Sequence, residues 1–374
     1  MSAATPTKPH PSLTQSFATR AALPNVHPLS RYLFLLMTAK SSNLCLAADV
    51  TTSSQLLEIA EEVGDHICVL KTHADIIYDW GENTITSLQE IAERKRFLIF
   101  EDRKFGDIGS TVQRQYTAGP LQIIRWASLT NAHVFPGPAI ISALKAAARN
   151  SRRSYNQSVQ TQISAEDKTG SPNDQSPSNH HPAHLSSEGS MDSIVSTTTI
   201  ETHVEPSGRA LSDSSDSAER AFHELGEPPL ERGLLLLAQM SSQNNLLTAD
   251  YTRECVNMAR QHPDFVVGLI AQQCLNVLPE DNFITFTPGV SLPPRDHSAS
   301  PDHPTAAVGP RKMSATDGLG QQYHTPRNVI YEMGSDIAIV GRGILGSRNR
   351  ASEAKRFQDE SWAAYQARIA RLIS

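Results

Sequence analysis

The sequence predicts an α/β protein with the (β/α)8 TIM-barrel architecture and a disordered insertion between the fourth and fifth strands. Three observations lead to this prediction: eight short apolar runs recur along the chain, amphipathic patterns separate most of them, and polar side chains follow nearly every run. Strands buried on both faces of a parallel sheet are continuously apolar rather than alternating. Eight such strands alternating with helices in about 300 ordered residues fit a closed barrel.

The expected strands are the apolar runs at residues 44–49, 67–71, 97–101, 127–132, 234–240, 265–271, 283–287 and 337–341. Amphipathic helices are expected at residues 53–63, 84–95 and 138–148, with a weaker candidate at 250–261 and a closing helix at 351–372. A doubly wound open sheet is the alternative, but no G-x-G-x-x-G follows the first strand, which weakens it.

Composition divides the chain into three parts. Residues 1–38 contain many Pro, Ser and Thr residues near their start and are expected to form a loosely held N-terminal arm. Residues 151–227 are rich in Ser, Asn, Gln, Asp, Thr and Pro, and such a segment cannot bury enough apolar surface to offset the entropy of ordering it. The barrel is therefore assigned to residues 39–150 and 228–374, with 151–227 as a low-complexity insertion.

Charge and cysteine usage exclude several classes of protein. The net charge of -6 gives no basic excess that would favour nucleic acid. The apolar run at residues 32–37 is too short to span a bilayer and lacks the layout of a secretory signal, so no membrane association is expected. The four cysteines are widely spaced without a C-x-x-C pair. They are expected to be free thiols in a reducing compartment, which predicts a cytoplasmic protein without a zinc site.

The most informative motif follows the third apolar run, where Asp102, Lys104 and Asp107 form a D-x-K-x-x-D pattern. Clustered charges at the end of a buried strand are costly unless they are paired, so they point to a functional site. Chemistry in this architecture lies at the carboxyl ends of the strands. Asp49 and Lys71 end the first and second strands, so all five charged groups are expected around one rim.

The end of the eighth strand predicts a phosphate site. Gly341, Arg342 and Gly343 combine backbone N–H groups that a ligand can approach closely with a guanidinium that suits phosphate oxygens. Loops after the seventh and eighth strands commonly hold phosphate in this fold. The segment 320–323, before the eighth strand, is placed to fold over such a ligand.

These residues resemble a known family, the orotidine 5'-phosphate decarboxylases of the fungal type. The similar segments are 43–50, 70–73, 100–111, 130–133, 287–290, 320–323 and 340–343, and they follow one another in the family's order. The loop at 291–317 is longer than the resemblance requires. The resemblance implies a cofactor-free, metal-free enzyme that converts orotidine 5'-monophosphate (OMP) into uridine 5'-monophosphate (UMP) and CO2, the last step of UMP synthesis.

The resemblance also implies roles for individual residues. Lys104 is similar to the proton donor to C6 of the pyrimidine, and Asp102, Asp107 and Lys71 complete its charged array. The active site of the family is completed across a homodimer, which would carry Asp107 and Thr111 into the partner's site. The expected substrate contacts are Asp49 on the ribose, Ser241 and Pro288 at the base, and Gln321, Tyr323, Gly341 and Arg342 at the phosphate.

Two other functions are consistent with a barrel of this kind. A related lyase would use Mg²⁺ to hold an enediolate and would need carboxylates free to bind the metal. A non-catalytic phosphate-binding scaffold could instead recruit partners through the insertion. The intact D-x-K-x-x-D motif argues against both, because the lysines are expected to neutralise the carboxylates and because a scaffold does not need the motif.

Overall fold

Eight parallel strands close into a barrel in which every strand pairs with its neighbours in sequence and β8 pairs with β1. The computed structural model describes residues 9–166, 222, 225–242, 244–293 and 323–371, with only the backbone for 155–166. The strands are β1 (Leu44–Ala47), β2 (Val69–Thr72), β3 (Leu98–Phe105), β4 (Leu129–Ala132), β5 (Gly233–Leu237), β6 (Val266–Ile270), β7 (Ile284–Thr287) and β8 (Ile337–Val340). The predicted TIM barrel is confirmed.

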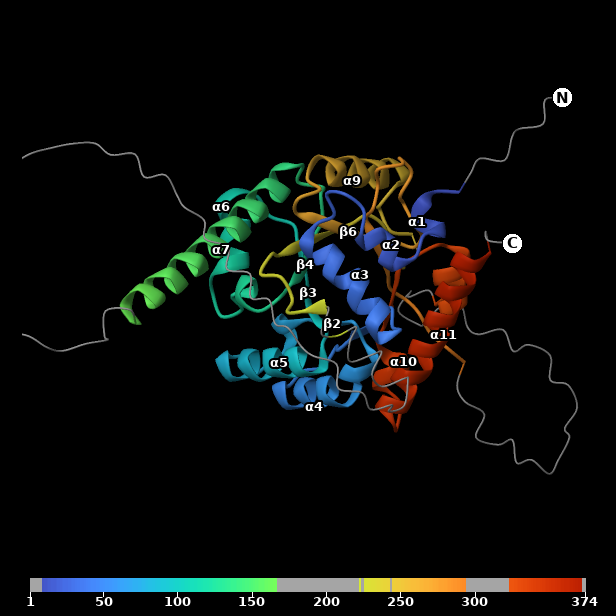
Figure 1. Cartoon of the computed structure of the whole chain (residues 1–374), viewed down its shortest axis with the longest axis horizontal. Helices are drawn as coiled ribbons and strands as arrows, with labels where there is room; N and C mark the ends of the chain where they lie inside the picture. Colours follow the sequence, from blue (N-terminus) through green and yellow to red (C-terminus); the bar gives the residue numbers. More distant parts are fainter. Residues whose placement is uncertain (1–8, 167–221, 223–224, 243, 294–322, 372–374) are drawn as a thin grey trace, which may run out of the picture.

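Helices surround the barrel and cover one of its ends (Figure 1). They are α1 (Pro11–Thr14), α2 (Phe17–Ala21), α3 (Pro28–Lys40), α4 (Ser53–Val63), α5 (Glu82–Lys95), α6 (Gly109–Thr117), α7 (Ala139–Glu166), α9 (Ala249–Gln261), α10 (Arg342–Leu345) and α11 (Arg350–Ala370). A short π-helical segment, Arg327–Glu332, lies between β7 and β8. The weaker helix candidate at 250–261 is thus a real helix, capped by the Thr248 side chain.

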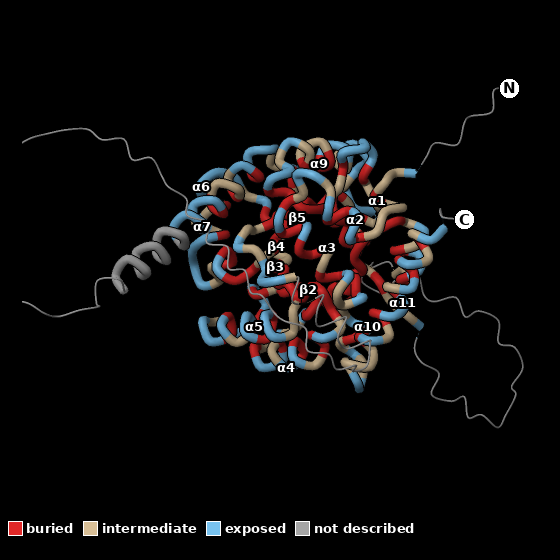
Figure 2. The backbone as a smooth tube through the Cα atoms, viewed as in Figure 1, coloured by how far each residue is buried: buried red, intermediate tan, exposed pale blue. Residues whose placement is uncertain are grey.

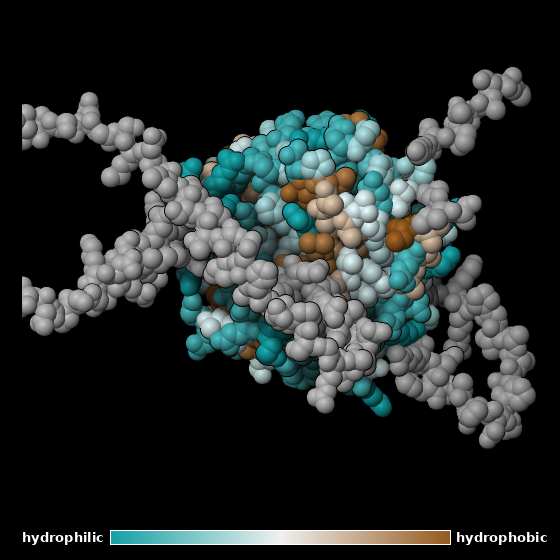
Figure 3. All heavy atoms as spheres, viewed as in Figure 1, coloured by the Kyte–Doolittle hydropathy of each residue, from teal (hydrophilic) through white to brown (hydrophobic). Residues whose placement is uncertain are grey.

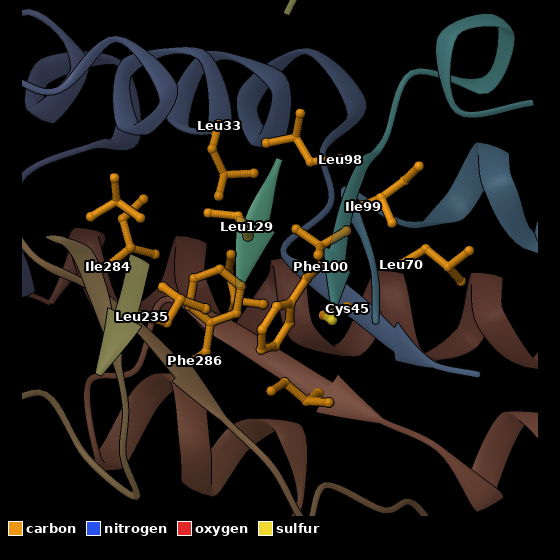
Figure 4. Packing of buried hydrophobic residues seen from close by; sticks show 14 of the residues in the cluster. Leu33, Cys45, Leu70, Leu98, Ile99, Phe100, Leu129, Leu235, Ile284 and Phe286 are labelled. Carbon is orange, nitrogen blue, oxygen red and sulfur yellow. The ribbon is translucent and has the colours of Figure 1, made fainter. Parts of the chain in front are cut away.

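The core is continuous through the barrel and out to the helices. Buried residues concentrate along the strands, and exposed ones lie at the periphery (Figure 2). Phe100 and Phe286 meet inside the barrel edge to face, with ring centroids 6.1 Å apart, and Leu33 of α3 lies beside Leu98 and Leu129 (Figure 4). The face in view is mostly hydrophilic, with apolar side chains in small patches (Figure 3). Helix α3 thus packs against the amino ends of the strands, because Leu98 and Leu129 are the first residues of β3 and β4. The carboxyl ends of the strands remain for the site.

The N-terminal segment differs from the loosely held arm that composition suggested. Residues 11–40 form three helices, and the Phe17 ring stacks on Tyr365 of α11 with centroids 4.0 Å apart. Leu29 of α3 packs where β5 begins, so close to Gly233 that an added Cβ there would lie 2.9 Å from it. The polar composition was misleading because Ser16 caps α2 and His27, followed by Pro28, caps α3.

A buried ion cluster fixes this segment to the barrel. Arg20 of α2 lies 2.6 Å from Asp336, which precedes β8, and Arg368 of α11 lies 3.3 Å from the same carboxylate. Arg20 also donates to Asn282 and to the Phe283 carbonyl. Because all three charged side chains are almost inaccessible to water, removing one of them leaves a buried charge poorly compensated.

We expect Arg20→Leu to lower the free energy of unfolding by about 3–5 kcal/mol, the usual cost of breaking a buried ion pair. The control is Arg94→Leu, which removes a two-point contact with Glu61 on the exposed surface and should cost far less, because water screens exposed ion pairs. Urea unfolding of both variants measures the difference. Equal losses would contradict a stabilising role for the buried cluster.

The predicted insertion begins later than composition indicated. Helix α7 continues to Glu166, well past the expected boundary at residue 150, and projects away from the barrel (Figure 1). At the other end, Phe222 packs against the core and its ring lies 5.5 Å from the Arg96 guanidinium. Residues 167–221 lie outside the described residues. In the ranges that are described, no helix is both long enough and apolar enough to cross a membrane.

Candidate active site

A pocket of about 250 Å³ opens at the carboxyl ends of the strands. Its lining contains nine of the residues that the sequence singled out as catalytic or substrate-binding. These are Asp49, Lys71, Asp102, Lys104, Ser241, Pro288, Tyr323, Gly341 and Arg342. The pocket therefore brings together side chains that are up to 293 positions apart in the chain, from Asp49 to Arg342.

Three charged side chains that line the pocket form an alternating array. The two oxygens of the Asp102 carboxylate are divided between two ammonium groups: Oδ1 lies 2.7 Å from Lys104 Nζ and Oδ2 lies 3.1 Å from Lys71 Nζ. Lys71 also donates to Asp49, at 3.2 Å. Side-chain exposure rises from 8% for Lys71 and 12% for Asp102 to 36% for Lys104. The Lys104 ammonium is thus the member of the array that is most accessible to a ligand.

Electrostatics keep Lys71 and Asp102 ionised. Burial by itself raises the pKa of Asp102, but hydrogen bonding with His73 and the charges of Lys71 and Lys104 outweigh it and hold that pKa well below its usual range. Burial lowers the pKa of Lys71, yet the carboxylates of Asp102 and Asp49 more than compensate and raise it. At neutral pH Asp102 is therefore a carboxylate and Lys71 an ammonium group, held 3.1 Å apart.

Strand β3 places Asp102 and Lys104 on the same face, because side chains two residues apart along a strand point to the same side. Phe100, Asp102 and Lys104 all line the pocket. The strand extends to Phe105, beyond the expected end at Glu101, and its register with β4 shifts between these two residues. Lys104 sits in this irregular stretch with a φ of 50°, a conformation that few residues other than glycine adopt. Such strained backbone persists only when its surroundings hold it.

Asn131 of β4 supplies that support, and sequence reasoning missed it as a site residue. Its side-chain oxygen accepts a hydrogen bond from the Lys104 backbone N–H, and its side-chain nitrogen donates to Asp102, both at 2.7 Å. It lies almost fully buried at the wall of the pocket. One amide thus fixes the strained backbone of Lys104 and the carboxylate that pairs with it. The only signal in the sequence was its place at the end of the fourth strand.

His73 contacts the array, and sequence reasoning missed it as well. Its Nε2 lies 2.9 Å from Lys71 Nζ, 3.3 Å from Asp102 and 3.8 Å from Asp49. It directly follows β2, which ends at Thr72. The sequence placed a polar residue here but offered no reason to connect it with the two carboxylates.

Glu101 is a second buried carboxyl group, directly next to Asp102 in the chain but outside the pocket lining. It accepts hydrogen bonds from the Thr72 hydroxyl at 2.7 Å and from the Ala74 N–H at 3.1 Å. Burial raises its pKa to about 8, against the lowering effect of these two hydrogen bonds, and the nearby Asp75 and Asp102 raise it further. At neutral pH this group is therefore largely protonated.

The raised pKa of Glu101 predicts a pH dependence of stability. Between its usual value of about 4.3 and the folded value of about 8, the folded state binds the proton more tightly than the unfolded state, so this group contributes less to stability as the pH rises. We expect Glu101→Gln, which cannot ionise, to lose this pH-dependent contribution. In urea unfolding, the free energy of unfolding of the wild type minus that of the variant should be larger at pH 5 than at pH 8. A difference that does not change with pH would contradict the prediction.

The same pocket carries the groups expected at a phosphate. The Arg342 guanidinium lies over the Tyr323 ring, 5.5 Å from its centroid. Gly341 lies beside the first strand, where an added Cβ would approach Ala47 at 3.5 Å and Asp49 at 3.9 Å. Ser241 and Pro288 also line the pocket. Gln321, the remaining predicted phosphate contact, lies outside the described residues.

Asp107 and Thr111 do not join the pocket of their own chain. The Asp107 carboxylate accepts hydrogen bonds from the Ile108 N–H at 2.8 Å and from Gln115 at 3.2 Å, and neither Asp107 nor Thr111 lines the pocket. Thr111 lies exposed in α6. Two predicted site residues thus lie outside the pocket formed within one chain.

The cysteines and the acidic residues give no metal site in the described part of the chain. All four cysteines are free thiols. Within the same residues, no group of three or more His, Cys, Asp or Glu side chains is arranged to hold a metal ion. Both oxygens of Asp102 are already bonded to lysines, so the charged array is built to neutralise a carboxylate internally rather than through a cation from solution.

Comparison with known proteins identifies the family of the chain. The model of the orotidine 5'-phosphate decarboxylase / HUMPS family matches residues 42–357. The chain belongs to this family. The match begins just before β1 and ends within α11, so it includes every strand of the barrel.

Relatives in this decarboxylase family match nearly the whole chain. The orotidine 5'-phosphate decarboxylase of Aureobasidium pullulans is 43% identical over 357 residues, which cover 96% of this chain and 95% of that protein. The enzyme of the same name from Hypocrea jecorina is 41% identical and covers 97% and 100% of the two chains. The uridine 5'-monophosphate synthase of Bos taurus is 34% identical over 95% of this chain but only 53% of its own length.

Proposed function

We propose that this protein decarboxylates OMP to UMP and CO2, the last step of de novo pyrimidine synthesis. The observation that carries the proposal is that one pocket holds both the Lys71–Asp102–Lys104 array and the Tyr323–Arg342 pair. An anionic nucleotide with a carboxylated base matches such a pocket, with the phosphate at the arginine and the reacting carbon at Lys104. Membership of the decarboxylase family supports the same assignment.

The reaction breaks one carbon–carbon bond and forms one carbon–hydrogen bond. Loss of CO2 leaves the bonding electron pair on C6 of the pyrimidine, in the plane of the ring, where the π system cannot delocalise it. The Lys104 ammonium, the most accessible cation of the array, would stabilise this developing charge and then give a proton to C6. Its neutral amine regains a proton from solvent before the next turnover.

Asp102 contributes by holding that ammonium in place. The attraction between this ammonium and the charge that develops on C6, taken as unit charges about 4 Å apart, is worth roughly 4 kcal/mol at an effective dielectric constant of about 20. That is a share of the ~8–23 kcal/mol by which enzymes typically lower a barrier. The low pKa of Asp102 keeps the carboxylate charged throughout. Because the ammonium is fixed before the substrate reacts, little reorganisation is needed as charge develops.

The remaining pocket residues would bind the parts of the substrate that do not react. Arg342, Tyr323, Gly341 and Gln321 are assigned to the phosphate, and Asp49 with Lys71 to the ribose. Ser241 and Pro288 are assigned to the base. Binding energy at the phosphate would drive closure over the site and exclusion of water, which raises turnover rather than affinity alone.

We further propose that the enzyme is a homodimer in which Asp107 and Thr111 enter the partner's pocket. Their position outside the pocket of their own chain supports this. So do the apolar side chains around them, since Ile108 is 56% exposed and Phe135 is 67% exposed. Phe135 also packs against Gly106, where an added Cβ would lie 3.1 Å from its ring. A second subunit would cover this surface and add a carboxylate near Lys104.

The proposed chemistry uses neither a metal nor an organic cofactor, and the free thiols favour a cytoplasmic location. The first experiment follows the change in absorbance as purified protein converts OMP, with and without EDTA. We expect turnover that the chelator does not change. EDTA-sensitive turnover would favour the magnesium-dependent lyase, and a folded protein without any turnover would favour a binding scaffold.

A further inference from the structure

Glu101 forms a clasp on the chain where β2 ends, behind the charged array. Its carboxyl group accepts from the Thr72 hydroxyl and from the Ala74 N–H, which are the residues on either side of His73. Thr72 and Glu101 are partners in the register of β2 and β3. The backbone carbonyl of Glu101 in turn accepts from the Thr130 hydroxyl of β4, at 3.1 Å. The clasp therefore connects three adjacent strands just beneath the rim.

The residue held by this clasp contacts the array directly. His73 lies 2.9 Å from Lys71 and 3.3 Å from Asp102, and its backbone leaves the strand at φ -127° and ψ 82°. A side chain at the first residue after a strand keeps its direction only if the backbone on both sides is fixed. Thr72 and Ala74, both almost completely buried, are the two points at which Glu101 provides that constraint.

The buried carboxyl group of this clasp lowers the free energy of folding less than an apolar side chain could, so stability alone does not account for it. A buried carboxyl group loses its hydration, and the raised pKa of Glu101 reflects that cost. Packed apolar side chains commonly stabilise a core better than buried polar groups do. Because side chains alternate along β3, Glu101 points away from the pocket while Asp102 points into it, so any influence on the ligand passes through the end of β2.

We propose that Glu101 is a positioning residue that sets His73 and Lys71 for the ribose end of the substrate. The inference rests on the proposed function, because it requires a ribonucleotide in the pocket with its hydroxyls near Asp49 and Lys71. Loosening the clasp moves His73 and Lys71 away from those hydroxyls and leaves Arg342 and Tyr323 unaffected. Recognition of the ribose weakens as a result, while the phosphate contacts persist.

The test is the ratio of the dissociation constants of 2'-deoxy-UMP and UMP, measured by calorimetry on the full-length protein. Wild type should bind UMP more tightly, and Glu101→Leu should lower the ratio by about tenfold, the value of one hydrogen bond to a charged group. Thr72→Val removes one donor of the clasp at nearly constant shape and should lower the ratio by about threefold. Glu101→Gln keeps an acceptor and should preserve most of the ratio.

The matched control is Asp281→Asn at the opposite end of the barrel. Asp281 also clasps a loop, accepting from the Val277 and Leu278 N–H groups at 2.8 Å. It should lower the melting temperature without changing the ratio. An unchanged ratio in Glu101→Leu and Thr72→Val, despite lower melting temperatures, would overturn the inference, and if Glu101→Leu does not fold, Thr72→Val decides. A wild type that neither binds UMP nor converts OMP would instead overturn the proposed function.

Discussion

Lys104→Ala is expected to lower kcat/KM for OMP by about 10⁴-fold, the upper range for a positioned general acid, because the same ammonium also stabilises the developing charge. The variant loses the only cation of the array that is substantially exposed to the pocket. Lys71 cannot replace it, because its ammonium is buried between Asp49 and Asp102. Steady-state turnover of OMP measures the loss.

The structure offers a matched control for this variant. Lys145→Ala removes an ammonium that pairs with Asp264 before β6, at the other end of the barrel, and should leave turnover unchanged. Lys104→Ala should remain folded, because its side chain is one-third exposed and contributes little to the core. A folded Lys104→Ala enzyme that converts OMP within tenfold of wild type would contradict the assignment of Lys104 as proton donor.

The fold was predictable because its signal is local. Each strand is a short apolar run, and in this architecture the position of a residue relative to the strand end determines whether it reaches the site. Asp49, Lys71, Asp102 and Arg342 were therefore found without knowledge of any contact between strands. All four line the same pocket.

The supporting residues were not predictable by the same reasoning. The role of Asn131 depends on the register shift between β3 and β4 and on the positive φ of Lys104, and neither leaves a pattern in the sequence. His73 and Glu101 act across the β2–β3 pair. A sequence specifies which residues follow a strand, but packing decides which neighbouring side chains hold them.

At the N-terminal helices, composition predicted a loose segment where the structure is ordered. Pro, Ser and Thr residues suggested a loose segment, although several of them cap or begin helices. The decisive contacts are with distant residues, such as Arg20 with Asp336 and Phe17 with Tyr365. No local pattern could have indicated that these apolar and charged side chains are buried against the C-terminal helix.

Mixing inactive Lys104→Ala chains with inactive Asp107→Ala chains is expected to restore OMP turnover. If Asp107 enters the partner's pocket, a mixed dimer has one site that lacks both residues and one site in which both are intact. Random exchange makes half of the dimers mixed, so the mixture should recover up to about one quarter of the wild-type activity per chain. This recovery is large because each parent should retain almost none.

The experiment requires proof of subunit exchange, which two different affinity tags on the parent chains provide through co-purification of mixed dimers. The double variant Lys104→Ala/Asp107→Ala mixed with wild type is the matched control, since every mixed dimer then has one defect in each site. This control mixture should show only the OMP turnover of the wild-type dimers that remain in it. Demonstrated exchange without recovery would exclude a shared site, and Asp107 would then have to act within its own chain, where its carboxylate is bonded to Ile108 and Gln115.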